Sequence, residues 1–235
     1  MANCLRQRLV LASWAAALLL VAAPTWASEI VVYSQSPDNM AIFASQNDAG
    51  GFGAFATSYD NFTLGSATAI NQVTWVGGYG NPSTPGTITG WTVDFYADKA
   101  GQPGVLIASS SILGNGGETS MGTDLDGHPI FGYTAAVSFN AAPGTEYWMS
   151  VVPDLVFPPQ WGWTSSSTGD RISYTDFFGV RQPNCIPLNP PPGCAPTDLA
   201  FALYMQQTIP EPRSLMLLGT GIMGIAGMLR RKRGA

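Results

Sequence analysis

Residues 91–96 read Trp-Thr-Val-Asp-Phe-Tyr, and this stretch shows most clearly the pattern on which the fold prediction depends. Large apolar residues occupy every second position from Trp91 to Phe95, with Thr92 and Asp94 between them. Because successive side chains of a strand point to opposite faces, the alternation predicts a β-strand, here over residues 87–97. The turn dipeptide Pro103-Gly104 follows, so residues 105–113 are predicted to return as the hairpin partner.

Similar short runs continue to Gln206, separated by clusters of Gly, Pro, Asn and Asp, and no amphipathic helical pattern lies among them. Further strands are predicted over residues 29–34, 52–64, 69–76, 131–139, 145–152, 172–178 and 198–206, and one begins at Trp161. Bulky residues on both faces of residues 145–152 predict a central strand. Loops are predicted over residues 37–51 and 114–129, and a turn at Gly77-Gly78. The sequence therefore predicts an all-β, antiparallel, jelly-roll-like β-sandwich of roughly nine or ten strands.

The N-terminal residues have the order of a secretory signal peptide. Arg6 and Arg8 precede an apolar run from Leu9 to Ala23, and Thr25-Trp26-Ala27 is a small-residue cleavage site. Residues 1–27 are therefore interpreted as a signal peptide, with an uncleaved N-terminal anchor as the alternative. Residues 28–209 remain as one predicted ectodomain.

The charge of the predicted ectodomain is strongly acidic. Residues 28–209 hold three basic and fourteen acidic side chains, for a formal net charge of −11. Such a surface repels nucleic acid and anionic lipid headgroups, so no nucleic-acid partner is expected. Neutral glycans, cations or other proteins are the classes of partner that this charge permits.

Two cysteines remain in the ectodomain, Cys185 and Cys194. An oxidising compartment makes a disulfide the expected state of such a pair. Two thiols without a neighbouring histidine do not make a zinc site, so no metal and no cofactor are predicted.

The C-terminal residues combine three signals in a fixed order. Pro210-Glu211-Pro212 comes first, an uncharged apolar run from Leu215 to Leu229 follows, and the basic residues Arg230, Arg231, Lys232 and Arg233 end the series. Proline restricts its own and the preceding backbone, which predicts an extended peptide at Glu211. A short transmembrane helix is predicted over residues 214–229, because spanning a bilayer takes about 20 apolar residues. The basic cluster is expected to stay cytoplasmic.

This series resembles the PEP-CTERM sorting signal of exported bacterial proteins, which predicts a sorting domain over residues 210–235. The resemblance implies that exosortase, a membrane protease, recognises Pro210, Glu211 and Pro212 and cleaves near them. It also links the chain to bacteria that make extracellular polysaccharide. An unprocessed membrane anchor is the alternative. Short ectodomain segments, among them residues 144–148 and 198–201, also resemble a recurring PEP-CTERM ectodomain, which implies a secreted β-sandwich without catalytic residues.

Motifs for catalysis are weak. His128 is the only histidine, and no Gly-x-Ser-x-Gly motif accompanies it. Asp124-x-Asp126-Gly127 resembles the start of an EF-hand loop, but the later ligand positions fail, so a turn is preferred and a different calcium site stays open. No catalytic residue is assigned, and the chain is predicted not to be an enzyme.

Trp161 and Trp163 share one face if their segment is extended. They are interpreted as core residues, with an exposed platform that stacks on sugar rings as the alternative. The predicted function is that of an exported, exosortase-processed surface or matrix protein, anchored transiently in the inner membrane and associated with exopolysaccharide or biofilm. The alternatives are a carbohydrate-binding module and a secreted hydrolase.

Overall fold

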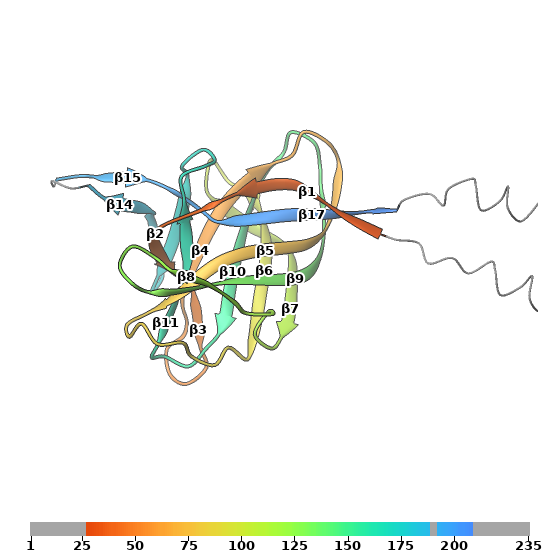
Figure 1. The fold of residues 1–235 in the computed structure, drawn as a ribbon. Helices are drawn as coiled ribbons and strands as arrows, with labels where there is room; N and C mark the ends of the chain where they lie inside the picture. Colours follow the sequence, from red (N-terminus) through yellow and green to blue (C-terminus); the bar gives the residue numbers. More distant parts are fainter. Residues whose placement is uncertain (1–26, 189–191, 209–235) are drawn as a thin grey trace, which may run out of the picture. The chain divides into compact units, whose positions relative to one another are not determined.

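The structure is a computed structural model that describes residues 27–188 and 192–208. The described residues form seventeen strands and no helix, and Glu29–Gln206 is one compact unit (Figure 1). The predicted all-β class and antiparallel sandwich are confirmed. The described residues do not include residues 1–26 of the predicted signal peptide (residues 1–27), the predicted transmembrane helix over residues 214–229 or the other C-terminal signals.

The first sheet has eight strands and contains both ends of the described chain. Its strands are β1 (Ala27–Gln35), β2 (Pro37–Ala44), β5 (Thr68–Gly80), β8 (Thr119–Thr123), β9 (Pro129–Ala141), β11 (Gln160–Ser166), β16 (Asp198–Leu199) and β17 (Phe201–Thr208). The order runs β1-β17-β5-β11-β16, with β2 on β11, β9 on β5 and β8 on β9. The last strand, β17, therefore lies between β1 and β5.

The second sheet has seven strands in the order β13-β12-β4-β3-β10-β6-β7. Its strands are β3 (Gln46–Asp48), β4 (Gly53–Thr63), β6 (Gly90–Asp98), β7 (Pro103–Leu113), β10 (Glu146–Asp154), β12 (Ser173–Phe177) and β13 (Val180–Pro183). All its pairings are antiparallel except the single parallel contact of β3 with β10, where Asn47 faces Asp154. The predicted hairpin of β6 and β7 is confirmed, as is the central position of β10 between β4 and β6.

The hydrophobic core lies between the two sheets and is rich in aromatic residues. Trp75, Tyr133 and Trp161 of the first sheet contact Trp91 of the second, with ring centroids 4.7–5.0 Å apart. Phe95 stacks on Phe139 farther along the sandwich, at 4.4 Å. All members of this core cluster lie between residues 62 and 203. Residues 28–208 therefore contain a complete core and are expected to fold as a separate polypeptide.

Three predictions of irregular backbone are wrong. The predicted loop over residues 37–51 contains β2 and β3, and the predicted loop over residues 114–129 contains β8. The predicted turn at Gly77-Gly78 lies inside β5, where the ring of Trp161 covers Gly77. A Cβ atom at Gly77 would lie only 2.0 Å from Cζ2 of Trp161. These glycines permit close packing and do not turn the chain.

The remaining strands, β14 (Cys185–Pro187) and β15 (Cys194–Pro196), form a separate two-stranded hairpin. Figure 1 shows this hairpin projecting away from the sandwich. Cys185 and Cys194 are joined by a disulfide with a Cα–Cα distance of 5.4 Å, which confirms the predicted pair.

Candidate functional site

The two tryptophans considered as a sugar-binding platform are in the core. Trp161 and Trp163 lie in β11, and each is 0% exposed. Trp161 Nε1 donates to the hydroxyl of Tyr133 (3.1 Å), and Trp163 Nε1 donates to the carbonyl of Ala200 (2.8 Å). The core interpretation is confirmed and the platform interpretation is wrong, because the inter-sheet side of β11 is covered by the other sheet.

Exposed aromatic side chains instead meet at one end of the sandwich. Three segments bring together Phe52, Phe55, Phe157, Phe177 and Phe178, which form a phenylalanine cluster. The ring centroid of Phe178 lies 5.8 Å from that of Phe52, 5.5 Å from that of Phe55 and 4.9 Å from that of Phe177. Phe52 and Phe178 are each 59% exposed, whereas Phe55 is buried beneath them. The cluster is an apolar surface on a rigid base.

A buried carboxylate holds two of these segments together. Oδ1 of Asp48 accepts hydrogen bonds from the backbone N–H groups of Gly50 (2.9 Å) and Phe157 (3.1 Å). Its Oδ2 accepts one from the N–H of Phe52 (2.9 Å). These bonds, that of Phe52 first, lower the pKa of Asp48. The loops before β4 and after β10 are thereby fixed to each other at neutral pH.

Phe178 occupies a backbone conformation that bulky residues seldom adopt. Its φ is 48°, and Gly179 beside it has φ 79°, in the turn between β12 and β13. Two positive φ values in a two-residue hairpin turn are typical of Asn-Gly, because a Cβ atom is strained there. The N–H of Phe178 donates to the carbonyl of Phe55 (2.7 Å), which fixes the turn against β4.

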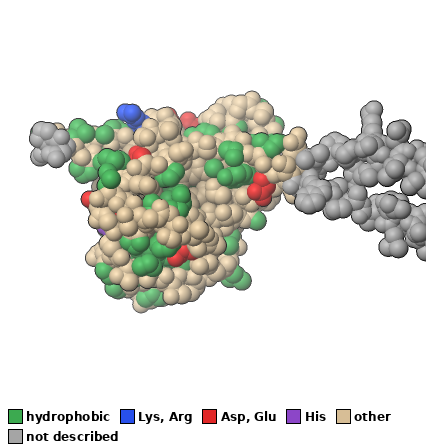
Figure 2. All heavy atoms as spheres, viewed as in Figure 1, with side chains coloured by type: hydrophobic (Ala, Val, Ile, Leu, Met, Phe, Trp, Pro, Cys, Tyr) green, Lys and Arg blue, Asp and Glu red, His purple; other side chains and the backbone are tan. Residues whose placement is uncertain are grey.

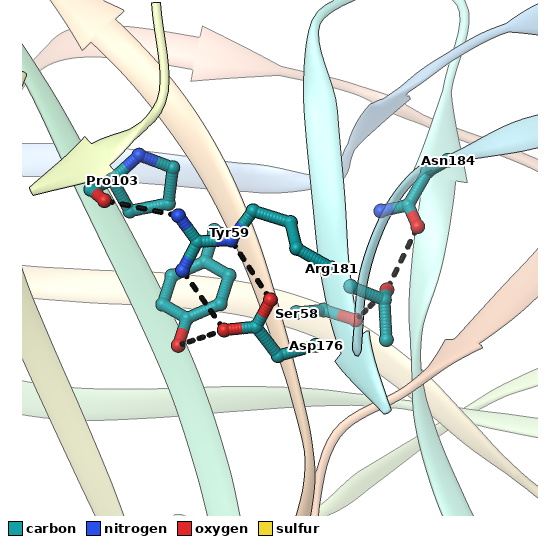
Figure 3. A network of polar contacts seen from close by, with 7 residues as sticks. Ser58, Tyr59, Pro103, Asp176, Arg181 and Asn184 are labelled. Carbon is teal, nitrogen blue, oxygen red and sulfur yellow. Dashed lines mark hydrogen bonds and ion pairs between the residues drawn. The ribbon is translucent and has the colours of Figure 1, made fainter. Parts of the chain in front are cut away.

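Beside the cluster, Arg181 and Asp176 form an ion pair whose opposite charges balance each other (Figure 3). Arg181 donates from Nε and Nη2 to the two carboxylate oxygens of Asp176, both at 2.8 Å, and from Nη1 to the carbonyl of Pro103 (3.1 Å). Its guanidinium lies 5.1 Å from the ring centroid of Tyr59. The hydrogen bond to Asp176 raises the pKa of Arg181, so its guanidinium stays protonated. It binds the β12–β13 hairpin to the sheet and leaves no uncompensated charge at this point.

The same hairpin is also held from the inter-sheet side. Ser58 Oγ and Thr175 Oγ1 are 2.7 Å apart, and Thr175 Oγ1 donates to Oδ1 of Asn184 (2.7 Å), as Figure 3 shows for Ser58 and Asn184. Hydroxyl groups thus replace apolar packing where β12 joins β4. The position of the exposed rings is therefore set by polar contacts on both faces of β12.

Two buried aspartates are the nearest approach to a catalytic carboxylate pair. Asp60 and Asp198 are both 0% exposed, and burial raises the pKa of each, that of Asp198 to about 6. Asp60 accepts the N–H groups of Asn61 and Leu199, and Asp198 accepts those of Arg171 and Ile172. Their oxygens connect the two sheets and the loop before β12. Neither carboxylate is open to a substrate in this arrangement.

One hollow of the described residues is small. It has a volume of about 150 Å³ and is lined by residues 34–37, 74–76 and 200–202, without a charged side chain. Pockets for small molecules are usually about 300–1,000 Å³. Its lining offers no group for acid–base or nucleophilic chemistry beyond serine and threonine hydroxyls.

The loop with the only histidine is a turn closed by its own aspartate. Asp124 Oδ1 accepts the N–H groups of Asp126 (3.0 Å) and His128 (2.7 Å), and Asp124 Oδ2 lies 2.7 Å from Nδ1 of His128. The preferred interpretation of Asp124-x-Asp126-Gly127 as a turn agrees with this geometry. Among the described residues, no group of three or more His, Cys, Asp or Glu side chains is arranged to hold a metal ion.

Sequence reasoning missed the phenylalanine cluster because its members come from three separate segments. The run Phe177-Phe178-Gly179 was the one available signal, since two adjacent phenylalanines before a turn glycine place an aromatic ring at a loop tip. Figure 2 shows one face of the molecule, on which charged side chains are sparse among polar and apolar ones. Within residues 27–188 and 192–208, no helix is long and apolar enough to cross a membrane.

Comparison with known proteins adds information on the C-terminal residues. No curated protein matches the chain significantly. A family model described as the PEP-CTERM protein-sorting motif matches residues 208–232. The match includes Pro210, Glu211 and Pro212 and most of the basic cluster, so it coincides with the predicted sorting signal. The chain carries a PEP-CTERM sorting motif, which implies a protein that is exported and sorted at its C-terminus by exosortase.

Proposed function

We propose that the chain is a non-enzymatic protein of the bacterial cell surface or extracellular matrix. The motif match at residues 208–232 carries this proposal. The burial of Asp60 and Asp198 supports a structural or binding role over a hydrolytic one. Its partners are exosortase during processing and extracellular polysaccharide afterwards.

The proposed route includes a transient membrane anchor. Export begins with the signal peptide of residues 1–27, and translocation stops at the apolar run from Leu215 to Leu229. The basic residues 230–233 hold the orientation, because placing Lys or Arg in the bilayer centre costs about 3 kcal/mol each. Pro210-Glu211-Pro212 then lies just outside the membrane, within reach of a membrane-embedded protease. Cleavage there releases the acidic ectodomain.

Expression with and without an exosortase tests this route. We expect mass spectrometry of the mature protein to show a C-terminus near Glu211 only when the protease is present. Glu211→Ala should leave full-length protein in the inner membrane, while Glu29→Ala, at an exposed glutamate outside the motif, should be processed normally. A mature protein that keeps Arg230 to Ala235 in a strain with the protease would show that the tail is a plain anchor.

A specific observation favours polysaccharide contact through the phenylalanine cluster. Phe52 and Phe178 expose more than half of their surface, although aromatic side chains are usually buried. Phe178 is held at a positive φ, where Asn or Gly would be less strained. Strained backbone that the surrounding structure enforces is enriched at binding sites. The partner is expected to be neutral, because the ectodomain is acidic and the adjacent Asp176–Arg181 pair is already balanced.

Phe178→Asn is the informative variant. Asparagine suits the first position of this turn, so the relieved strain of about 1–2 kcal/mol offsets the lost ring contacts, and stability should stay close to that of the parent protein. Binding to neutral polysaccharide from the producing strain, measured by affinity electrophoresis, should fall by about tenfold or more. Leu125→Asn, at an exposed apolar residue elsewhere, should bind as the parent does. Unchanged binding by Phe178→Asn would exclude the cluster as the contact surface.

A further inference from the structure

Strand β7 forms one edge of the second sheet and has an unusual composition for an edge. The strand, Pro103–Leu113, reads Pro-Gly-Val-Leu-Ile-Ala-Ser-Ser-Ser-Ile-Leu and carries no charge. Val105, Leu106 and Ile107 are consecutive and exposed, and Leu113 is 95% exposed. Ala108 and Ile112 pack against the core, so the strand is firmly held, and among the described strands only β6 is hydrogen-bonded to it.

The opposite edge of the same sheet has protective features that β7 lacks over residues 104–113. Strand β13, Val180–Pro183, has four residues, and it contains Arg181 and ends in Pro183. Short length, a charged residue and proline are the features by which edge strands avoid pairing with other chains. Strand β7 has eleven residues. Its bulge near Phe95 and Tyr96 disturbs only the first half, and residues 108–113 pair regularly with β6.

The free edge presents a row of backbone N–H and C=O groups in ladder geometry, which another strand can pair with in place of water. We propose that β7 pairs antiparallel with β7 of a second copy of this chain, so that the two seven-stranded sheets join into one. This inference rests on the described strands alone and does not depend on the sorting motif or on polysaccharide binding.

The strand is complementary to itself about Ser110. An antiparallel pair with a two-fold axis at Ser110 sets Ala108 opposite Ile112, and Ile107 opposite Leu113, on both sides of the axis. The three serines at residues 109–111 are small and let the backbones approach. The two exposed apolar residues Ile107 and Leu113 thereby cover each other twice, which is why a second copy fits this edge better than an unrelated strand.

Charge adds a condition to this pairing. Each ectodomain has a net charge of −11, and β7 brings none of it into the interface. The two copies therefore repel at long range and gain apolar and hydrogen-bond contacts at short range. The Debye screening length falls from about 30 Å at 0.01 M salt to about 8 Å at 0.15 M, which weakens the repulsion between the two copies. The association constant should therefore rise with salt.

Sedimentation of residues 28–208 over about 10 μM to 1 mM tests the proposal, since a single strand pair implies a weak dimer. We expect a concentration-dependent dimer that strengthens with salt. Leu113→Lys should lower the association constant by about tenfold, through a like charge at each end of the interface. Leu125→Lys makes the same change of charge at an exposed loop residue and should not lower it. Both variants should unfold as the parent does.

Cysteine substitution tests the register. The Cα atoms of opposed residues in an antiparallel pair lie about 4.5–5.5 Å apart, within the range that a disulfide bridges. Mild oxidation should therefore link Ser110→Cys into a dimer and leave Ser120→Cys of β8 monomeric. A monomer at every concentration, equal loss of association in both lysine variants, or a dimer that Ser110→Cys does not link would each overturn antiparallel β7 pairing.

Discussion

Gly77→Ala tests the aromatic core most directly. A Cβ atom at residue 77 would lie 2.0 Å from Cζ2 and 2.6 Å from Cε2 of Trp161, and 2.6 Å from the carbonyl oxygen of Gly162. Carbon atoms make favourable contact at about 3.5–4.0 Å, so the Trp161 ring would have to move by about 1.5 Å. The ring cannot move freely, because Trp91 and Tyr133 pack against it.

The expected cost follows from what that movement breaks. Inserting a methyl group into a packed core costs about 1–3 kcal/mol. Displacing the ring also weakens the hydrogen bond from Trp161 Nε1 to the hydroxyl of Tyr133, and a buried donor left without a partner costs about 1–3 kcal/mol more. Gly77→Ala should therefore lower the free energy of unfolding by about 2–6 kcal/mol.

Urea unfolding followed by circular dichroism measures this free energy. Gly65→Ala is the matched control, because a Cβ atom there meets nothing within 4 Å, and it should change stability by less than about 1 kcal/mol. In a double-mutant cycle, Trp161→Leu makes room for the methyl group, so the two losses should fall short of additive by about 2 kcal/mol. A Gly77→Ala protein within 1 kcal/mol of the parent, or strictly additive losses, would refute the packing argument.

Three further predictions concern pH, the disulfide and the base of the phenylalanine cluster. Burial raises the pKa of Asp198 to about 6 and that of Asp60 above its usual range, so the free energy of unfolding should fall as pH rises from about 4 to 6, by up to about 3 kcal/mol from Asp198; melting temperatures that do not fall over this range would contradict it. Cys185→Ser should cost less than about 2.5 kcal/mol by calorimetry, because its hairpin lies outside the sandwich and the half-cystines are only 9 positions apart; a larger loss would make the hairpin part of the global fold. Asp48→Ala should increase amide hydrogen exchange in residues 50–52 and 155–158 and leave exchange in β6 unchanged; equal exchange in the loops would show that the aspartate does not hold them.

The sequence predicted strands where burial is one-sided or complete. In β6 the alternation from Trp91 to Phe95 matches the inward and outward side chains, and the β6–β7 hairpin follows from its turn residues. In β5 the rule that glycine marks a turn failed, because Gly77 lies inside the strand, where the ring of Trp161 leaves no room for a Cβ atom. Strand β3 was missed because Gln46 and Asp48 are polar, yet both are buried as hydrogen-bond partners of the backbone.

The candidate surface could not be predicted, for a related reason. The spacing of Trp161 and Trp163 correctly indicated a shared face, but the pattern does not say whether another sheet covers that face. Phe52 lies more than one hundred residues before Phe157 and Phe178 in the sequence, and only the tertiary fold brings the three rings together. The sorting motif was predictable because it is read as a local series of residues.

The place of β17 between β1 and β5 has a mechanical consequence. The chain leaves the sandwich through a strand that is hydrogen-bonded on both sides, so a pull along β17 must shear two ladders together instead of unzipping one. Tension on the C-terminal end would thus be shared by the ladders that β17 forms with β1 and β5, and β17 would not peel away before they yield.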